Sequence, residues 1–508
     1  MTSTPADAPA ISRNKSFSTV FLIELWERFG FYGMQVLIVY FMVQQLGFAD
    51  RRANLVWGAA AALIYVAPAV GGWIGDKILG TRRTMLIGAS VLALGYACMS
   101  VPTVNTWFLF AAIGVIIVGN GLFKANAGNL VRKIFEGDDS KIDSAFTIYY
   151  MAVNVGSAVS QLLTPWVKDY VNEVYGHGYG WHAAFAVCFF GLLVGLANYF
   201  VMRASMHHIG SEPDHHPVAW HKLGLVAIGA IAAIALSTAI LQYETLARIF
   251  VLGAGLAVLA IFWFLISRGD RAERAGLIAA LVLVVQTVFF FIFYQQMSSS
   301  LALFALRNVD PDFSVFGVHL WNWSPAQFQA LNPLWIMVLS PILASLYTRA
   351  GNRGADLSIA SKFALGFVFV AIGFFVYSSA IWFATNGKAN SWVMVWGYGF
   401  GALGELLVSG LGLAMIARYV PARMSGFMMG AYFVSSGCSQ YLGGLVANVA
   451  SVPEGVTDPT QTLPIYTTLF FELGVTGVIC TLIAFAVVPW MKRLGRIHAA
   501  GAEAMSTH

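Results

Sequence analysis

Three ionisable residues interrupt the first hydrophobic segment of the chain. Glu24, Glu27 and Arg28 stand inside an otherwise apolar stretch, residues 20–32. A charge near the centre of a bilayer costs about 2.5 kcal/mol or more, so such a cluster is first taken as a functional site. On a helix Glu24 and Arg28 share a face, and Glu27 flanks them. Two carboxylates competing for one cation could bind and release a proton; the alternative is a static ion pair that orients the helix.

Two further charges lie in later apolar segments. Lys124 ends the apolar run 116–123, and Glu405 interrupts the run 399–404. If two halves of the molecule face each other, Lys124 and Glu405 could pair across a central cavity and present opposite charges to a zwitterion. The alternative is two unrelated structural residues.

Uncharged polar residues accompany these charges. Asn154 and Asn332 add hydrogen-bonding groups within predicted spans, and Pro333 frees a backbone carbonyl where its helix bends. Glu472, in the last span, has no evident cation and is given no role.

Composition defines the elements that must position these residues. The 508 residues are 58% hydrophobic and 10% charged, with a mean hydropathy of +0.72, whereas a soluble domain carries about 25% charged residues. The chain is therefore predicted to be an all-α polytopic membrane protein. Its basic residues are dispersed among short loops, which argues against nucleic-acid binding.

About fourteen segments are long enough to cross the roughly 30 Å of hydrocarbon as helices. Lys and Arg concentrate in alternate loops, so both termini are expected to be cytoplasmic, with the protein in the cell inner membrane. The polar tail suggests no removed signal peptide. The predicted spans are 17–45, 53–75, 83–101, 106–131, 142–167, 181–203, 221–242, 246–267, 274–304, 325–348, 359–384, 391–418, 422–449 and 464–490.

The sequence also indicates internal symmetry. The loop at residues 72–83, GWIGDKILGTRR, has a degraded echo at residues 347–353, YTRAGNR. This arrangement resembles the major facilitator superfamily, in which two six-helix bundles rock about a central site. The predicted organisation is a tail (1–16), an N-terminal bundle (17–203), a linker with two inserted helices (204–273), a C-terminal bundle (274–490) and a cytoplasmic tail (491–508).

Five motifs extend the resemblance to one branch of that superfamily. Residues 24–32, ELWERFGFY, are similar to the ExxERFxYY signature of proton-coupled oligopeptide transporters. The stretches 119–126, 146–157, 328–333 and 404–406 follow in the order of that family. The inserted pair resembles the fourteen-span prokaryotic members.

The resemblance implies roles for individual residues. Glu24, Glu27 and Arg28 would take part in proton coupling together with Glu405, which would also hold the amino group of a peptide. Lys124 would pair with Glu405 and sense the peptide carboxylate. The other residues that would line the substrate site are Tyr32, Gln35, Tyr65, Asn154, Phe291, Gln295 and Asn332.

Departures from the family pattern concern the same site. Many members carry an arginine at the position of Gln35 and a glutamate at that of Gln295, and these pair across the halves. Here both are glutamine. Because both charged residues of the pair are replaced, neither charge is left without its partner. Because no histidine lies near the middle of a predicted span, we expect carboxylates to bind and release the coupling proton.

The expected function is therefore proton-coupled import of di- and tripeptides by alternating access. The alternative is a relative that moves another small solute, such as a peptide-like drug, an amino acid or nitrate. No catalytic pair, metal cluster or phosphate loop suggests an enzyme, so no cofactor is expected beyond the coupling proton. The expected partners are peptides, protons and lipid, and one chain should suffice because it carries both halves.

Overall fold

The computed structural model describes residues 13–506, apart from residues 138, 177, 316, 354–356, 409–418 and 421–423. Nine helical segments in this part of the chain are long and apolar enough to cross a membrane. Five other helices, α1, α3, α5, α14 and α16, pack alongside them, and nine plus five gives the fourteen that the sequence predicts. The predicted helical membrane class is confirmed. Most of the predicted N-terminal tail and part of the predicted span 391–418 lie outside the described residues.

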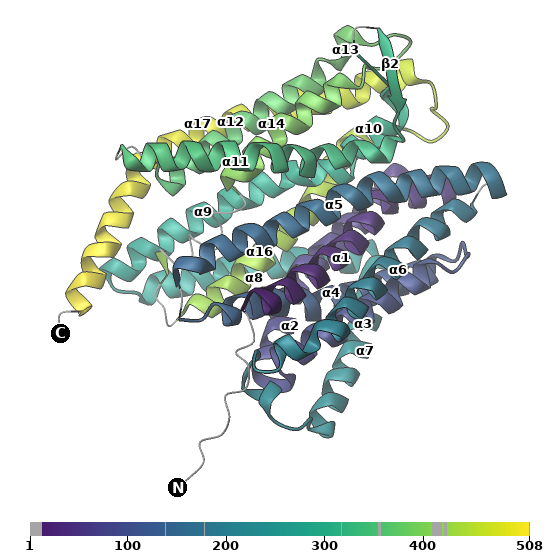
Figure 1. Ribbon diagram of the computed structural model, residues 1–508. Coiled ribbons are helices and arrows are strands. Elements are labelled where there is room, and N and C mark those ends of the chain that lie inside the picture. The colour runs from purple at the N-terminus through teal and green to yellow at the C-terminus, as the bar shows by residue number, and fades with distance from the viewer. Residues whose placement is uncertain are drawn as a thin grey trace.

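The first six helices form one bundle, the N-half (Figure 1). Helix α1 packs against α5 and α6, while α4 packs against α2 and α3. Glycines allow the close approach of α2 and α4, since a Cβ at Gly71 would lie 1.9 Å from the carbonyl oxygen of Gly121. The helices are α1 (Arg13–Tyr40), α2 (Asp50–Ile74), α3 (Thr81–Met99), α4 (Thr106–Ile134), α5 (Asp139–Tyr175) and α6 (Tyr179–Met202), with π-helical turns at Phe41–Gln45 and Gly75–Leu79.

The later helices form a second bundle, the C-half, beside the first (Figure 1). The predicted span 274–304 is broken by a 3-10 turn, Gln296–Ser298, into α9 and α10. The helices are α9 (Arg271–Gln295), α10 (Ser300–Asn308), α11 (Leu331–Asn352), α12 (Ile359–Ser378), α13 (Ala380–Phe383), α14 (Trp392–Val408), α16 (Ser425–Ala447) and α17 (Pro459–Ser506), with 3-10 turns at Pro325–Ala330 and Asn448–Ala450.

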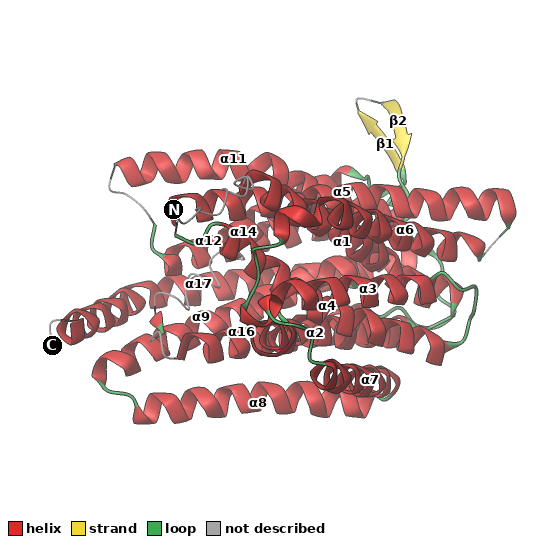
Figure 2. Ribbon diagram, turned by 60° about the horizontal axis from the view of Figure 1, so that its bottom comes forward, coloured by secondary structure: helices red, strands yellow, loops and turns green. Residues whose placement is uncertain are grey.

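Two inserted helices lie against the outside of both bundles (Figure 2). Helix α7 (Trp220–Gln242) packs on α4, and α8 (Glu244–Arg268) packs on α16 and α9. Only 17% of the most apolar window of each is buried. Such exposed apolar faces suit contact with lipid.

A short antiparallel hairpin connects α10 to the turn before α11. Strand β1 (Asp312–Val315) pairs with β2 (Val318–Asn322), and the ring of Phe313 stacks on Trp321 with 5.0 Å between centroids. The hairpin projects at one end of the bundles, and α17 ends at the other (Figure 1). We call these the hairpin end and the tail end.

The His-rich connection between α6 and α7 is anchored to the N-half at the tail end. Asp214 is buried and accepts hydrogen bonds from the backbone nitrogens of Arg82 and Arg83, at 3.0 and 3.2 Å. This places a carboxylate at the N-terminus of α3, which its dipole favours. The segment contains the 3-10 turns Arg203–Met206 and Glu212–His215. Its four histidines, at 207, 208, 215 and 216, are exposed.

Candidate functional site

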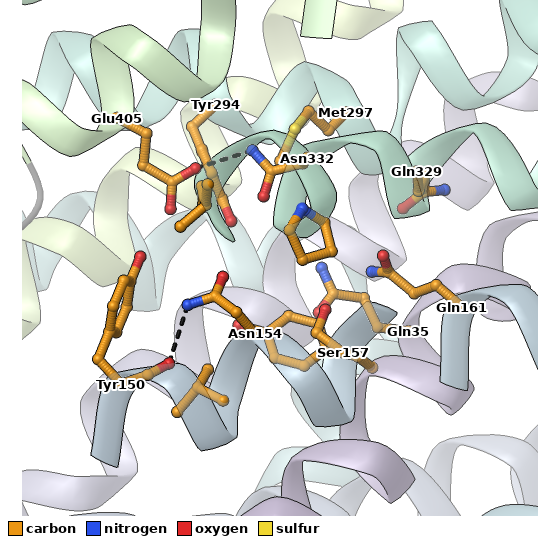
Figure 3. Close-up of a pocket in the computed structure, with 14 residues that line it drawn as sticks. Gln35, Tyr150, Asn154, Ser157, Gln161, Tyr294, Met297, Gln329, Asn332 and Glu405 are labelled. Atoms are coloured by element: carbon orange, nitrogen blue, oxygen red, sulfur yellow. Dashed lines mark hydrogen bonds between the residues drawn. The ribbon is translucent and has the colours of Figure 1, made fainter. Parts of the chain in front are cut away.

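A cavity of about 70 Å³ lies between the halves and is lined by α1, α5, α9, α11 and α14 (Figure 3). Five residues expected at the substrate site line it, namely Tyr32, Gln35, Asn154, Asn332 and Glu405. The sequence interpretation did not single out Tyr150, Val153, Ser157, Gln161, Tyr294, Met297, Gln329 or Ile336, which complete the wall together with Pro333.

Among the described residues, the one carboxylate that lines this cavity comes from the C-half. Glu405 is 8% exposed and accepts a hydrogen bond of 2.8 Å from Nδ2 of Asn332. From the opposite wall, Asn154 donates to the backbone oxygen of Tyr150 at 2.9 Å (Figure 3). The cavity thus presents a carboxyl group and several amides from both halves, a set suited to an ammonium group and a peptide backbone.

The ionisable trio of α1 is fully enclosed in the N-half. Arg28 makes a bidentate ion pair with Glu27, in which Nη2 donates to Oε1 at 2.7 Å, and its Nε lies 3.5 Å from Glu24 Oε1. All three side chains are at most 3% exposed. Glu27 is therefore the closer partner, while Glu24 Oε2 has no hydrogen-bond partner among the described residues. The predicted arrangement of two carboxylates around one cation is present.

Asn120 connects this trio to the neighbouring helices. Its Oδ1 accepts a 3.2 Å hydrogen bond from Arg28 Nη2, and its Nδ2 donates to the backbone oxygen of Ile64 at 3.2 Å. Asn120 is completely buried. The residue lies in the family-like stretch 119–126, but only its contact with Arg28 distinguishes it from a packing residue.

The predicted direct ion pair between Lys124 and Glu405 is not among the ion pairs of the described residues. Lys124 is exposed, and its Nζ lies 5.3 Å from the centre of the Tyr65 ring. Tyr65 in turn meets Phe291 edge-on, with 5.9 Å between centroids. Lys124, Tyr65 and Phe291 form a group outside the cavity wall, contrary to the expectation that the two rings line it. Among the described residues, Glu405 is instead hydrogen-bonded to Asn332.

Gln35 and Gln295, which stand where the resembling family often carries a charged pair, are separated. Gln35 lines the cavity, but Gln295 is 3% exposed and packs against α16, where a Cβ at Gly443 would lie 2.5 Å from the Gln295 Cβ. Its neighbour Gln296 donates to the backbone oxygen of Gly443 at 3.0 Å. Gln295 therefore does not line the central cavity in this conformation but lies against α16, and its role at the substrate site stays a prediction.

Polar contacts join the two halves toward the hairpin end. Arg307 of α10 makes a bidentate ion pair with Asp50 of α2, at 2.6 and 2.8 Å, and Asp50 also accepts from the backbone nitrogen of Val452 at 3.2 Å. Further bonds in this region run from Tyr40 Oη to the oxygen of Ala302 (2.9 Å), from Asn54 Nδ2 to Asn448 Oδ1 (3.1 Å) and from Gln327 Nε2 to the oxygen of Leu162 (2.8 Å).

Known proteins match the chain along almost its whole length. A family model described as the POT family matches residues 82–464. The dipeptide and tripeptide permease B of Salmonella typhimurium is 40% identical over 492 residues, covering 97% of this chain and 98% of that protein. The protein of the same name from Edwardsiella piscicida is 41% identical, with 96% and 98% covered.

This chain belongs to the POT family. A solved structure of tetrameric PepTSo2 is 66% identical, with a TM-score of 0.89, and covers 95% of this chain and 100% of that one. A structure that addresses substrate recognition in proton dependent oligopeptide transporters is 66% identical, with a TM-score of 0.85, over 94% and 100% of the two chains. The predicted family, transporter fold and non-enzymatic class are confirmed.

Proposed function

We propose that this POT family member imports di- and tripeptides together with protons. The observation that carries the proposal is that one helix, α1, holds both the enclosed trio Glu24, Glu27 and Arg28 and two residues of the cavity wall, Tyr32 and Gln35. A change of protonation in the trio therefore acts on the helix that touches the substrate. The permease names of the relatives support peptides as the cargo.

The charges of the trio suggest how a proton couples to movement. With all groups ionised, two glutamates and one arginine carry a net charge of −1, enclosed within the N-half. Because an excess buried charge is unfavourable, the trio favours the uptake of one proton by Glu24 or Glu27, which makes the three residues together neutral. Protonation also weakens the hold of the carboxylates on Arg28, which frees α1 to shift relative to α4.

Peptide recognition would use charges and amides from both halves. Glu405 would bind the peptide amino group, while Asn154 and Asn332 would hydrogen-bond the backbone. Lys124 would attract the peptide carboxylate after a movement that brings it from the Tyr65 ring toward the cavity. The termini and backbone are common to all short peptides, so this recognition admits many sequences.

The direction of transport follows from the direction of the proton gradient. We assign the tail end to the cytoplasm of a bacterial inner membrane, because Lys and Arg concentrate in the loops of that side. Each proton that moves inward across 100 mV releases about 2.3 kcal/mol, which can drive peptide accumulation.

A single chain is proposed as the transport unit, since one chain supplies both walls of the cavity. The tetramer of the PepTSo2 structure would then be an assembly of complete units. Uptake by reconstituted protein at one chain per vesicle tests this assignment.

Uptake into proteoliposomes with an imposed proton gradient tests the function. Glu405→Gln should reduce dipeptide uptake at least about tenfold, which corresponds to about 1.4 kcal/mol. Glu24→Gln should abolish gradient-driven accumulation while leaving peptide exchange at equal pH. Glu472→Gln, an exposed glutamate of α17, is the matched control and should transport normally.

Competition separates peptide transport from the transport of another solute. Dialanine and trialanine should compete for uptake, whereas free alanine and nitrate should not. Normal dipeptide uptake by Glu405→Gln, or stronger competition by nitrate or alanine, would overturn the proposal.

A further inference from the structure

A second cavity, of about 40 Å³, lies inside the C-half between α9, α12 and α14. It shares Tyr294, Met297 and Asn332 with the central cavity, so the two spaces are neighbours separated by those side chains. We call it the side pocket. A molecule held at Asn332 in the central cavity therefore lies next to the side chains that separate the two spaces.

The walls of the side pocket are mostly apolar rings. Phe290, Phe293, Phe374, Tyr377 and Tyr398 line it, and each is at most 5% exposed. The rings hold one another in place: Phe293 meets Phe374 with 5.6 Å between centroids, and Phe374 meets Tyr377 at 5.9 Å. A space with such walls favours an apolar group over water.

A glycine keeps one wall of the side pocket open. A Cβ at Gly401 would meet no atom within 4 Å. The neighbouring glycines of α14 differ, since a Cβ at Gly397 would lie 2.2 Å from the Tyr377 ring and one at Gly404 would lie 2.9 Å from Val370 Cγ2. Close helix packing therefore requires glycine at 397 and 404, whereas at 401 the missing side chain leaves room in the pocket wall.

We infer that the side pocket binds one apolar side chain of the transported peptide and favours a branched aliphatic one. The inference rests on the proposed function, because it places the peptide backbone at Asn332. A volume of about 40 Å³ is roughly three water-sized spheres of 10–15 Å³ each, which suits the few carbon atoms of valine, leucine or isoleucine. A phenylalanine or tryptophan ring needs more space than the walls leave.

Substitution at Gly401 tests the pocket by filling it. The inhibition constants of glycylleucine and glycylglycine are measured against uptake of a labelled dipeptide in proteoliposomes. The unmodified protein should bind glycylleucine about tenfold more tightly than glycylglycine, as expected when a leucine side chain is buried. In Gly401→Val this ratio should fall to about one. Gly229→Val, on the exposed face of α7 where a Cβ also meets nothing, should keep the ratio.

An enlarging substitution gives the opposite result and does not depend on how Gly401→Val folds. Val370 lines the pocket and is 5% exposed. Val370→Ala should raise the affinity for glycylphenylalanine relative to glycylleucine about tenfold. An unchanged ratio in both variants would overturn the inference. Failure of the unmodified protein to take up any dipeptide would instead contradict the proposed function.

Discussion

The two ends of the interface between the halves differ in how they are held. At the hairpin end Asp50 is 4% exposed and is paired with Arg307, which also donates to Tyr466 Oη. Toward the tail end Tyr150 is 38% exposed although it lines the central cavity, and Lys124 is exposed as well. The cavity is thus closed at the hairpin end and accessible from the tail end.

This difference indicates which contacts must change during transport. Alternating access requires the closed end to open, so the ion pair Asp50–Arg307 and the close packing of α2 on α16 must separate in each cycle. That packing depends on glycine, since a Cβ at Gly437 would lie 2.8 Å from the oxygen of Ala62. We call these contacts, the ion pair Asp50–Arg307 and the packing of α2 on α16, the lock. Their stability sets the equilibrium between the state open at the tail end and the state open at the hairpin end.

The largest effect is expected from Arg307→Met. The substitution leaves Asp50 buried without its cation, and breaking a buried pair costs about 3–5 kcal/mol. The closed hairpin end should become a minor state, seen as a longer distance between spin labels at Tyr175 and Trp382 in double electron–electron resonance. The double variant Asp50→Asn with Arg307→Met should recover much of the closed state. Unchanged distances in the single variant would show that the pair is not part of the lock.

A smaller effect is expected at the seam between α2 and α16. A Cβ at Gly444 would lie 2.7 Å from the backbone oxygen of Asn54, so Gly444→Val should force the helices apart at a cost of about 1–3 kcal/mol. The same spin-label pair should report partial opening. Gly430→Val, on the same helix but where a Cβ meets nothing within 4 Å, is the control. Equal behaviour of the two variants would contradict the role of the seam.

Between the ends, Asn120→Ala should weaken the link from the trio to α4. The loss of a hydrogen bond to a charged group costs about 1.5–3 kcal/mol when both partners are buried, and less where water enters. We expect dipeptide exchange at equal pH to continue while accumulation driven by a proton gradient falls several-fold. Asn129→Ala, on the exposed side where Asn129 donates to Asp76, serves as the control. Equal losses of exchange and accumulation would indicate a purely structural role.

The smallest effect concerns the start of α17 at the hairpin end. Hydrogen bonds from the backbone nitrogen and hydroxyl of Thr460 lower the pKa of the Asp458 carboxyl below its usual value. A lowered pKa in the folded state stabilises the protein above the pKa of the unfolded chain, and the contribution is lost as pH falls through the folded value. Asp458→Asn should therefore lower the Tm slightly near pH 7 and have no effect near ~pH 2. A Tm difference that grows toward acid pH would contradict this assignment.

The sequence predicted the elements better than it predicted their contacts. Spacing and resemblance identified Glu24, Glu27 and Arg28 as one cluster, because residues four apart lie on the same face of a helix. Glu405, Asn332 and Asn154 also meet at the predicted cavity. These placements share a cause: a polar side chain in an apolar helix needs a polar partner or water, so such side chains gather at the same sites.

The misses arise where the outcome depends on the conformation of the whole molecule. The pairing of Lys124 with Glu405 requires the bundles to approach, and no local pattern shows that the tail end is open. Gln295 lies against α16 at Gly443, where the missing side chain leaves room for it. Asp50 and Arg307 are 257 residues apart in the chain, so neither could be recognised as part of a lock without the fold.

The central claim is that binding of a proton and a peptide together closes the tail end of the interface and opens the hairpin end. Spin labels at Glu136 and Arg353, both exposed at the tail end of opposite halves, would measure it in a cysteine-free background in lipid nanodiscs. Acid pH with dialanine should shorten this distance and lengthen the one between Tyr175 and Trp382, while Glu24→Gln should make the response independent of pH. A tail-end distance that stays constant under conditions of active uptake would contradict the account.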